Sequence, residues 1–157
     1  MTDILVAGIG NVLRGDDGFG VEVVRRMAAR GVRDGVSVVD FGIRGFDLAF
    51  ALSSGKKAAV LVDAAQRGRS PGTLTVLEPS LLASETTIDT HAMHPLRAID
   101  LARRLGGVPD VMRVVACEPE VVGDEDEPLM GLSPSVAMAV DRAIELIDEL
   151  VAELRDA

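Results

Sequence analysis

Short, continuous runs of apolar residues constrain the fold of this chain more than any other feature. Three such runs, at residues 4–9, 58–62 and 111–117, consist mainly of Val, Leu, Ile, Ala and Met. Strands of this kind are buried on both faces, which is typical of a parallel sheet with helices on each side. Segments with helical periodicity separate the runs. The pattern therefore predicts an α/β fold in which strands alternate with helices.

Applied to the whole chain, the same signals predict five strands, at residues 4–9, 36–39, 58–62, 73–77 and 111–117. They predict helices after Gly20, at 46–52, at 95–105 and from Pro134 onward, and an irregular segment at 78–90. Ser133 is a suitable N-cap for the last helix, and Pro134 suits its first position. The length of 157 residues favours a single domain that spans residues 1–157.

Charge and cysteine content exclude several classes of function. The chain has 25 acidic and 16 basic residues, and a formal net charge of −9 disfavours binding to nucleic acid or anionic lipid. No apolar stretch is long enough to span a membrane. Cys117 is the single cysteine, and the N-terminus lacks the positive region of a secretory signal, so we expect a cytoplasmic protein.

Acidic residues and one histidine follow the predicted strands, at the edge where ligands bind to open α/β sheets. These residues are Asp16, Asp17, Asp40, Asp63, Asp89, His91 and Glu118. Clustered carboxylates raise one another's pKa or recruit a cation, and two carboxylates with one imidazole suit a borderline divalent metal. Each aspartate could also serve only as a turn former or a helix cap.

Other motifs allow alternative interpretations. Gly8 and Gly10 could begin a dinucleotide fingerprint, but Leu13 stands where its third glycine belongs, and nearby acids would repel pyrophosphate. His91 and His94 could form a metal pair; we favour His91 alone as a ligand, with His94 as a surface residue near it.

Two further side chains could be nucleophiles. Cys117 could act with His91, although a lone cysteine ending an apolar strand is more often a core residue. Ser133 lies in a segment that only partly resembles a nucleophile elbow, and its interpretation as a helix cap is better. The acidic segment 123–127 is interpreted as a solvated loop.

Seven segments, in order, resemble motifs of the [NiFe]-hydrogenase maturation endopeptidases, which trim the C-terminal extension of the hydrogenase large subunit. They are residues 8–20, 40–45, 62–64, 71–73, 90–93, 117–119 and 131–134. The sequence departs from the family pattern at Phe41 and Ile43, which replace Gly and Thr, and at Ala92, which replaces Gly.

The resemblance implies a three-layer α/β sandwich around a twisted, mainly parallel five-stranded sheet. It also implies that Asp17, Asp63 and His91 contact metal. We accordingly expect a peptidase with no permanently bound metal, in which these residues contact nickel supplied by the substrate, a hydrogenase large-subunit precursor.

Asp17 and Asp63 are the expected catalytic residues, and Asp40 is a third candidate, placed at the scissile bond or acting on water. We expect a monomer, because the partner docks at one edge. Two alternatives stay open: a non-catalytic metal-sensing or chaperone-like partner of the large subunit, and a nucleotide-binding protein.

Overall fold

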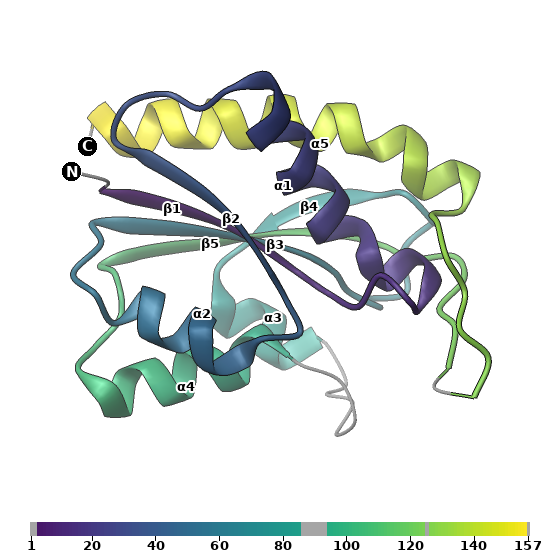
Figure 1. Ribbon diagram of the computed structural model, residues 1–157, viewed down its shortest axis with the longest axis horizontal. Helices are drawn as coiled ribbons and strands as arrows, with labels where there is room; N and C mark the ends of the chain where they lie inside the picture. The colour runs from purple at the N-terminus through teal and green to yellow at the C-terminus, as the bar shows by residue number, and fades with distance from the viewer. Residues whose placement is uncertain (1–2, 86–93, 125, 157) are drawn as a thin grey trace.

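A five-stranded sheet lies between two layers of helices in the computed structural model, which describes residues 3–85, 94–124 and 126–156 (Figure 1). The elements in chain order are β1 Ile4–Ile9, the 3-10 helix η1 Gly15–Gly18, α1 Phe19–Arg30, β2 Val36–Gly42, α2 Gly45–Leu52, β3 Ala58–Ala64, β4 Leu74–Leu77, α3 Pro79–Glu85, α4 Pro95–Leu105, β5 Val111–Cys117 and α5 Pro134–Asp156.

The strand order is β2-β1-β3-β5-β4. The pairs of β1 with β2, β1 with β3 and β3 with β5 are parallel, and β4 alone is antiparallel to its neighbour. All six residues of β1 are buried, as are six of the seven in β3, which explains why these strands are continuously apolar. The predicted mainly parallel sheet is confirmed.

Two hydrophobic clusters cover the two faces of the sheet. Side chains alternate along β3, so that Val60 and Val62 pack into one cluster and Ala59 and Leu61 into the other. The first cluster includes residues of α1 and α5, and the second includes residues of α2, α3 and α4. Figure 1 shows these helices on opposite sides of the sheet, which confirms the three-layer arrangement.

Helix boundaries follow the local sequence signals. Gly31, with φ of 101°, ends α1 in a conformation that side chains rarely adopt. Pro95 and Pro134 are the first residues of α4 and α5, where the missing N–H costs no hydrogen bond. Each of these helices buries an apolar stripe, and no described helix combines the length and low polarity needed to cross a bilayer.

Three sequence predictions need correction. Residues 79–85 form α3 rather than an irregular segment, because Leu82 alone anchors that short helix in the core and leaves no periodic stripe to detect. Strands β2 and β3 continue to Gly42 and Ala64, so that Asp40 and Asp63 lie within strands instead of after them. The parallel ladders account for this, since Asp40 is in register with Gly8 of β1 and Asp63 with Ala116 of β5.

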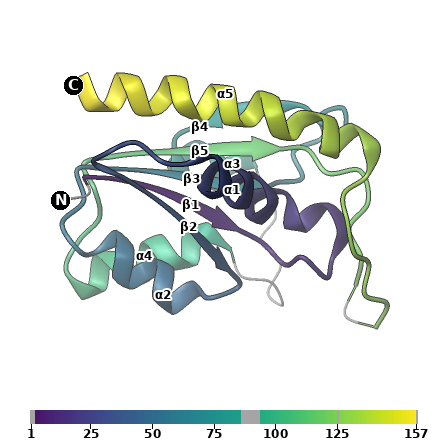
Figure 2. The same ribbon diagram turned by 45° about the horizontal axis from the view of Figure 1, so that its top comes forward.

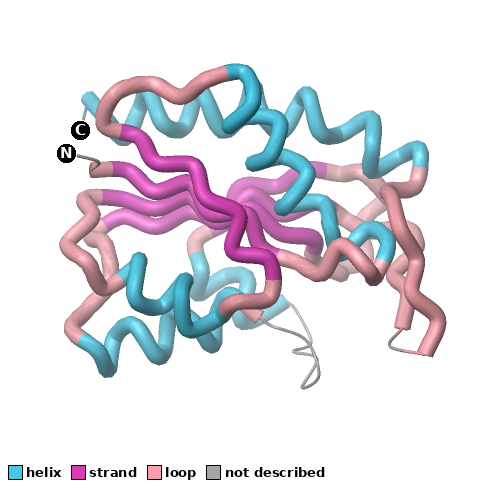
Figure 3. Tube along the Cα trace, viewed as in Figure 1, coloured by secondary structure: helices cyan, strands magenta, loops and turns pink. Residues whose placement is uncertain are grey.

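The parallel strands end at one common edge, which Figure 2 shows with their arrowheads on the right. The chain leaves β1 at this edge, passes through η1 and enters α1. The loop between β5 and α5 reaches the same region, where Gly15 N–H donates to the Leu129 carbonyl at 2.7 Å. Figure 3 shows the two loops side by side.

Candidate active site

Two glycines hold the loop after β1 directly against the ends of the strands. Gly10 has φ of 139°, and a Cβ atom there would collide with the backbone carbonyl of Asp17. A Cβ atom on Gly20, at the start of α1, would collide with the Val62 carbonyl of β3. The glycines therefore allow the close approach that places η1 over the carboxyl end of β3.

This approach places Asp17 within electrostatic reach of Asp63. Asp63 is only 7% exposed, and its pKa is raised well above the usual range, first by burial and then by the charge of Asp17. The Ala64 backbone N–H partly offsets this rise. Asp17 Oδ2 accepts from the Asn11 N–H at 2.8 Å, which orients its carboxylate. The structure thus brings two of the predicted site residues together as a carboxylate pair.

Asp16 has a different role, although it is the neighbour of Asp17. Its carboxylate is fully buried and accepts four hydrogen bonds: from the N–H groups of Glu120 and Val121 at 2.9 Å each, from Ser133 N–H at 2.7 Å and from Ser133 Oγ at 2.8 Å. We call this arrangement the Asp16 clamp. It ties η1 to the loop before α5.

The pKa of Asp16 reflects that arrangement. Burial, the largest single influence, raises the pKa, but the hydrogen bonds from Val121, Ser133 and Glu120 together bring it below the usual value. Asp16 therefore stays ionised and structural. Sequence reasoning placed both aspartates in one acidic cluster, and they are distinguished by the full burial of Asp16, the partial burial of Asp17 and their different hydrogen-bond partners.

Glu118 is also structural. Its side chain is 7% exposed, and Oε1 accepts from the backbone N–H groups of Arg67 at 2.9 Å and Arg69 at 3.0 Å. These bonds hold the turn after β3 against the end of β5. Sequence reasoning placed Glu118 at the correct edge of the sheet, but not this bonding role.

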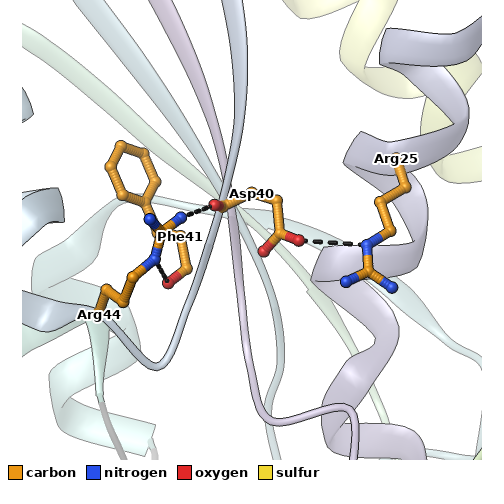
Figure 4. A network of polar contacts seen from close by, with 4 residues as sticks. All are labelled: Arg25, Asp40, Phe41 and Arg44. Atoms are coloured by element: carbon orange, nitrogen blue, oxygen red, sulfur yellow. Dashed lines mark hydrogen bonds and ion pairs between the residues drawn. The ribbon is translucent and has the colours of Figure 1, made fainter.

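Asp40 points away from the carboxylate pair. Asp40 of β2 and Val62 of β3 are both in register with Gly8 of β1, so their side chains face the same side of the sheet. Asp63 follows Val62 and faces the opposite side, because side chains alternate along a strand. The Oδ2 atom of Asp40 pairs with Arg25 Nε of α1 at 3.2 Å, while Arg44 donates to the Asp40 backbone carbonyl (Figure 4). The structure does not place Asp40 with the pair, and its catalytic role stays a prediction.

The structure describes one of the two histidines. His91, the third predicted metal ligand, and Asp89 lie outside the described residues. His94 is half-buried and is the N-cap of α4, because its Nδ1 accepts from the Leu96 N–H at 3.2 Å. This corrects its interpretation as a surface residue. Burial and the nearby Arg97 lower the pKa of His94, which keeps the ring neutral and able to accept.

Both candidate nucleophiles have structural roles. Cys117 is fully buried, and burial together with the charges of Asp16 and Glu118 raises the pKa of its thiol to about 12, so it is a core residue. Ser133 directly precedes α5 as predicted, but its hydroxyl donates to Asp16. Among residues 3–85, 94–124 and 126–156, no three acidic, histidine or cysteine side chains form a metal-binding group.

Together, the three-layer fold and the carboxylate pair at its carboxyl edge define an α/β protein with an acidic candidate site. Comparison with known proteins gives the class directly, because residues 21–150 match the family model of the hydrogenase maturation proteases.

Individual relatives agree. A Methanocaldococcus jannaschii protein named for the hydrogenase maturation proteases is 36% identical over 149 residues, covering 92% of this chain and 94% of its own length. The hydrogenase expression/formation protein HupD of Rhodobacter capsulatus is 34% identical over 157 residues, covering 97% of this chain and 71% of its own. The structure of the hydrogenase maturating endopeptidase HybD from Escherichia coli matches with a TM-score of 0.80 at 28% identity, covering 99% and 93% of the two chains.

The chain therefore belongs to the hydrogenase maturation protease family. It is a peptidase, as its relatives and structural neighbours are.

Proposed function

We propose that this peptidase removes the C-terminal extension of a [NiFe]-hydrogenase large-subunit precursor that already carries nickel. Asp17, Asp63 and His91 contact the nickel while the precursor is bound. The observation that supports this proposal is the carboxylate pair, in which a buried Asp63 lies under the charge of Asp17.

Electrostatics favours a cation at this pair. Two ionised carboxylates in a buried setting repel each other, and either a proton or a cation must compensate. Oxygen ligands from Asp17 and Asp63, with the imidazole of His91, are an appropriate set for a borderline divalent ion such as nickel. A nickel ion held by the precursor would thus relieve the repulsion only when substrate is present.

Substrate-held nickel also determines where cleavage occurs. Its contact with the carboxylate pair positions the peptide bond that follows the metal-binding motif of the precursor. Water then adds to the carbonyl carbon, activated by the nickel or by a neighbouring carboxylate, and the C–N bond breaks as the amine takes up a proton. A precursor without nickel lacks the group that the site recognises.

A cleavage assay tests this proposal with nickel-loaded and nickel-free precursor, followed by mass spectrometry of the products. We expect cleavage of the loaded form alone. Equal cleavage of both forms would refute recognition of nickel.

Two variants separate catalysis from mere binding. Asp17→Asn and Asp63→Asn should bind the precursor but not cut it, whereas Asp141→Asn, which changes a carboxylate that is 85% exposed, should cut normally. If the Asp17 and Asp63 variants lose binding and cleavage together, the two residues serve docking instead.

We further propose that the protein acts as a cytoplasmic monomer with no resident metal. The single, buried Cys117 suits a reducing compartment. Metal analysis and sedimentation of the purified protein test this proposal, and stoichiometric nickel or a stable dimer would contradict it.

A further inference from the structure

The outer edge of β2 is open for pairing. In the sheet order β2-β1-β3-β5-β4, β2 pairs with β1 on one side, and no other described segment pairs with it. It is seven residues long, Val36–Gly42, and contains no Lys or Pro that would block another strand. Such an edge offers a row of backbone donors and acceptors to an extended peptide.

The phase of the ladder shows which groups face outward. Ile4 N–H donates to the Gly35 carbonyl at 3.1 Å, so every second residue of β2 directs its backbone groups to β1. Val38 and Asp40 are the alternate residues and direct theirs away from β1. Arg44 donates to the outward Asp40 carbonyl (Figure 4), and the outward Val36 N–H donates to the Arg33 carbonyl at 3.2 Å. An added strand therefore pairs first with the outward groups between these two, above all those of Val38.

A hollow of about 260 Å³ lies beside this edge, on the face of the sheet that α1 and α5 cover. Val36 and Val38 of β2, Met27 of α1 and Val151 of α5 are among its apolar lining residues. A strand added to β2 would direct alternate side chains to this face, where the hollow has room for one of them.

The charges around the hollow suit a carboxylate. Two arginines, Arg30 and Arg33, and one acidic residue, Asp148, line the hollow. This basic excess contrasts with the formal net charge of −9 of the whole chain. Arg30 is engaged by Asp148 in two bonds of 2.7 Å, and Arg33 lies just before β2. A second copy of this chain is disfavoured as the occupant, because two molecules of net charge −9 repel each other.

We propose that the C-terminal extension of the precursor binds as an added strand along the outer edge of β2. This inference rests on the proposed function. The scissile bond lies at the carboxyl edge of the sheet, so the extension runs antiparallel to β2, and its terminal carboxylate reaches Arg33. Seven residues span about 23 Å in a strand, which is the full length of β2 along which the extension lies.

Val38→Pro tests the strand addition. Proline removes the outward N–H of Val38 but leaves the bonds to β1 intact. We expect KM for nickel-loaded precursor to rise about tenfold with little change in kcat, the effect of losing one or two good hydrogen bonds. The matched control is Val76→Pro on the opposite edge strand, where Glu118 N–H donates to the Thr73 carbonyl at 3.0 Å, so that the N–H of Val76 also faces outward. An equal KM in Val38→Pro and wild type would overturn the inference while leaving the proposed function intact.

Charge reversal tests the end of the extension. Arg33→Glu should raise KM severalfold, whereas Arg104→Glu at the exposed end of α4 should not. Equal KM values for these two variants would show that the terminal carboxylate does not contact Arg33.

Hydrogen exchange gives a measurement independent of cleavage. In Asp63→Asn, which holds the precursor uncut, backbone amides of residues 36–42 should exchange more slowly with precursor than with mature large subunit lacking the extension. The inference would be overturned by equal exchange of residues 36–42 with precursor and with mature subunit. It would also be overturned if these amides became protected at high concentration of this chain alone. Both outcomes can be read without measuring cleavage.

Discussion

Replacing Asp16 with asparagine tests how the Asp16 clamp supports the active-site loop. In the wild type, Oδ2 accepts three hydrogen bonds and Oδ1 accepts one, and all come from residues 120, 121 and 133. Asparagine keeps one acceptor oxygen but turns an NH2 group toward at least one of these donors. The clamp also loses its negative charge.

The size of the effect follows from the number of bonds. Hydrogen bonds to a charged group contribute roughly 1.5–3 kcal/mol each, and a buried donor left without a partner costs about 1–3 kcal/mol. Losing one bond and weakening three therefore predicts a loss of about 3 kcal/mol in the free energy of unfolding for Asp16→Asn. Chemical denaturation at pH 7 measures this quantity directly.

The control for this measurement is an exposed carboxylate that does not accept a set of buried hydrogen bonds. Asp141→Asn removes an exposed charge that is 3.4 Å from Arg26, and it should change the free energy of unfolding by less than about 0.5 kcal/mol. If Asp16→Asn is no less stable than Asp141→Asn, the four bonds do not stabilise the fold.

The pH dependence gives a second check on the same residue. The pKa of Asp16 is lower in the folded than in the unfolded chain, so its contribution is complete above the usual carboxyl range and is lost as the pH falls through the folded pKa. The stability difference between wild type and Asp16→Asn should therefore persist at pH 5 and shrink only in strong acid. A difference that disappears already near pH 6 would refute the assignment.

Three further predictions concern other side chains. Asp63→Asn should raise the free energy of unfolding of the metal-free protein at pH 7. The folded pKa of Asp63 is raised, so its ionisation destabilises the fold as the pH increases, and asparagine removes this cost. Chemical denaturation in the presence of a chelator measures the change, and a loss of stability would contradict the prediction. Cys117→Ala should still cleave, with a loss of about 1 kcal/mol in the free energy of unfolding. The native thiol, with a pKa of about 12, should resist iodoacetamide until the protein unfolds, and rapid labelling of the native protein would count against this. His94→Ala should lose about 1 kcal/mol in the free energy of unfolding while still cleaving. The cap should weaken as the pH falls below the usual imidazole range, because only the neutral ring accepts the Leu96 N–H. Abolished cleavage with unchanged stability would instead indicate a role in the site.

Much of the fold could be predicted because its signals are local. The continuous apolar runs of β1 and β3 and the prolines that begin α4 and α5 are visible in the sequence itself. Helix α3 could not be predicted, because one buried leucine is not a periodic pattern. The last residues of β2 and β3 were missed because a strand may continue through an aspartate when its ladder partners continue.

The site was predicted only in part, since its members are defined by contacts between distant segments. Position in the sequence placed Asp17 and Asp63 at one edge of the sheet, and the structure brings them together. Asp16 has the same residue type and nearly the same position, yet the three residues that donate its four bonds lie more than 100 residues away. Asp40 was grouped with them by its place near a strand end, but the alternation of the sheet directs it to Arg25.

Those long separations bear on how the protein is made. Asp16 bonds to a residue 117 positions later, so an emerging polypeptide has no partner for that buried carboxylate until most of it has left the ribosome. The strand β1 and the helix α1 can form early, but the short turn between them gains the bonds of Asp16 only when the segment before α5 arrives. Proteolytic competence is therefore acquired late in synthesis, and a nascent fragment that ends before residue 120 is not expected to cut.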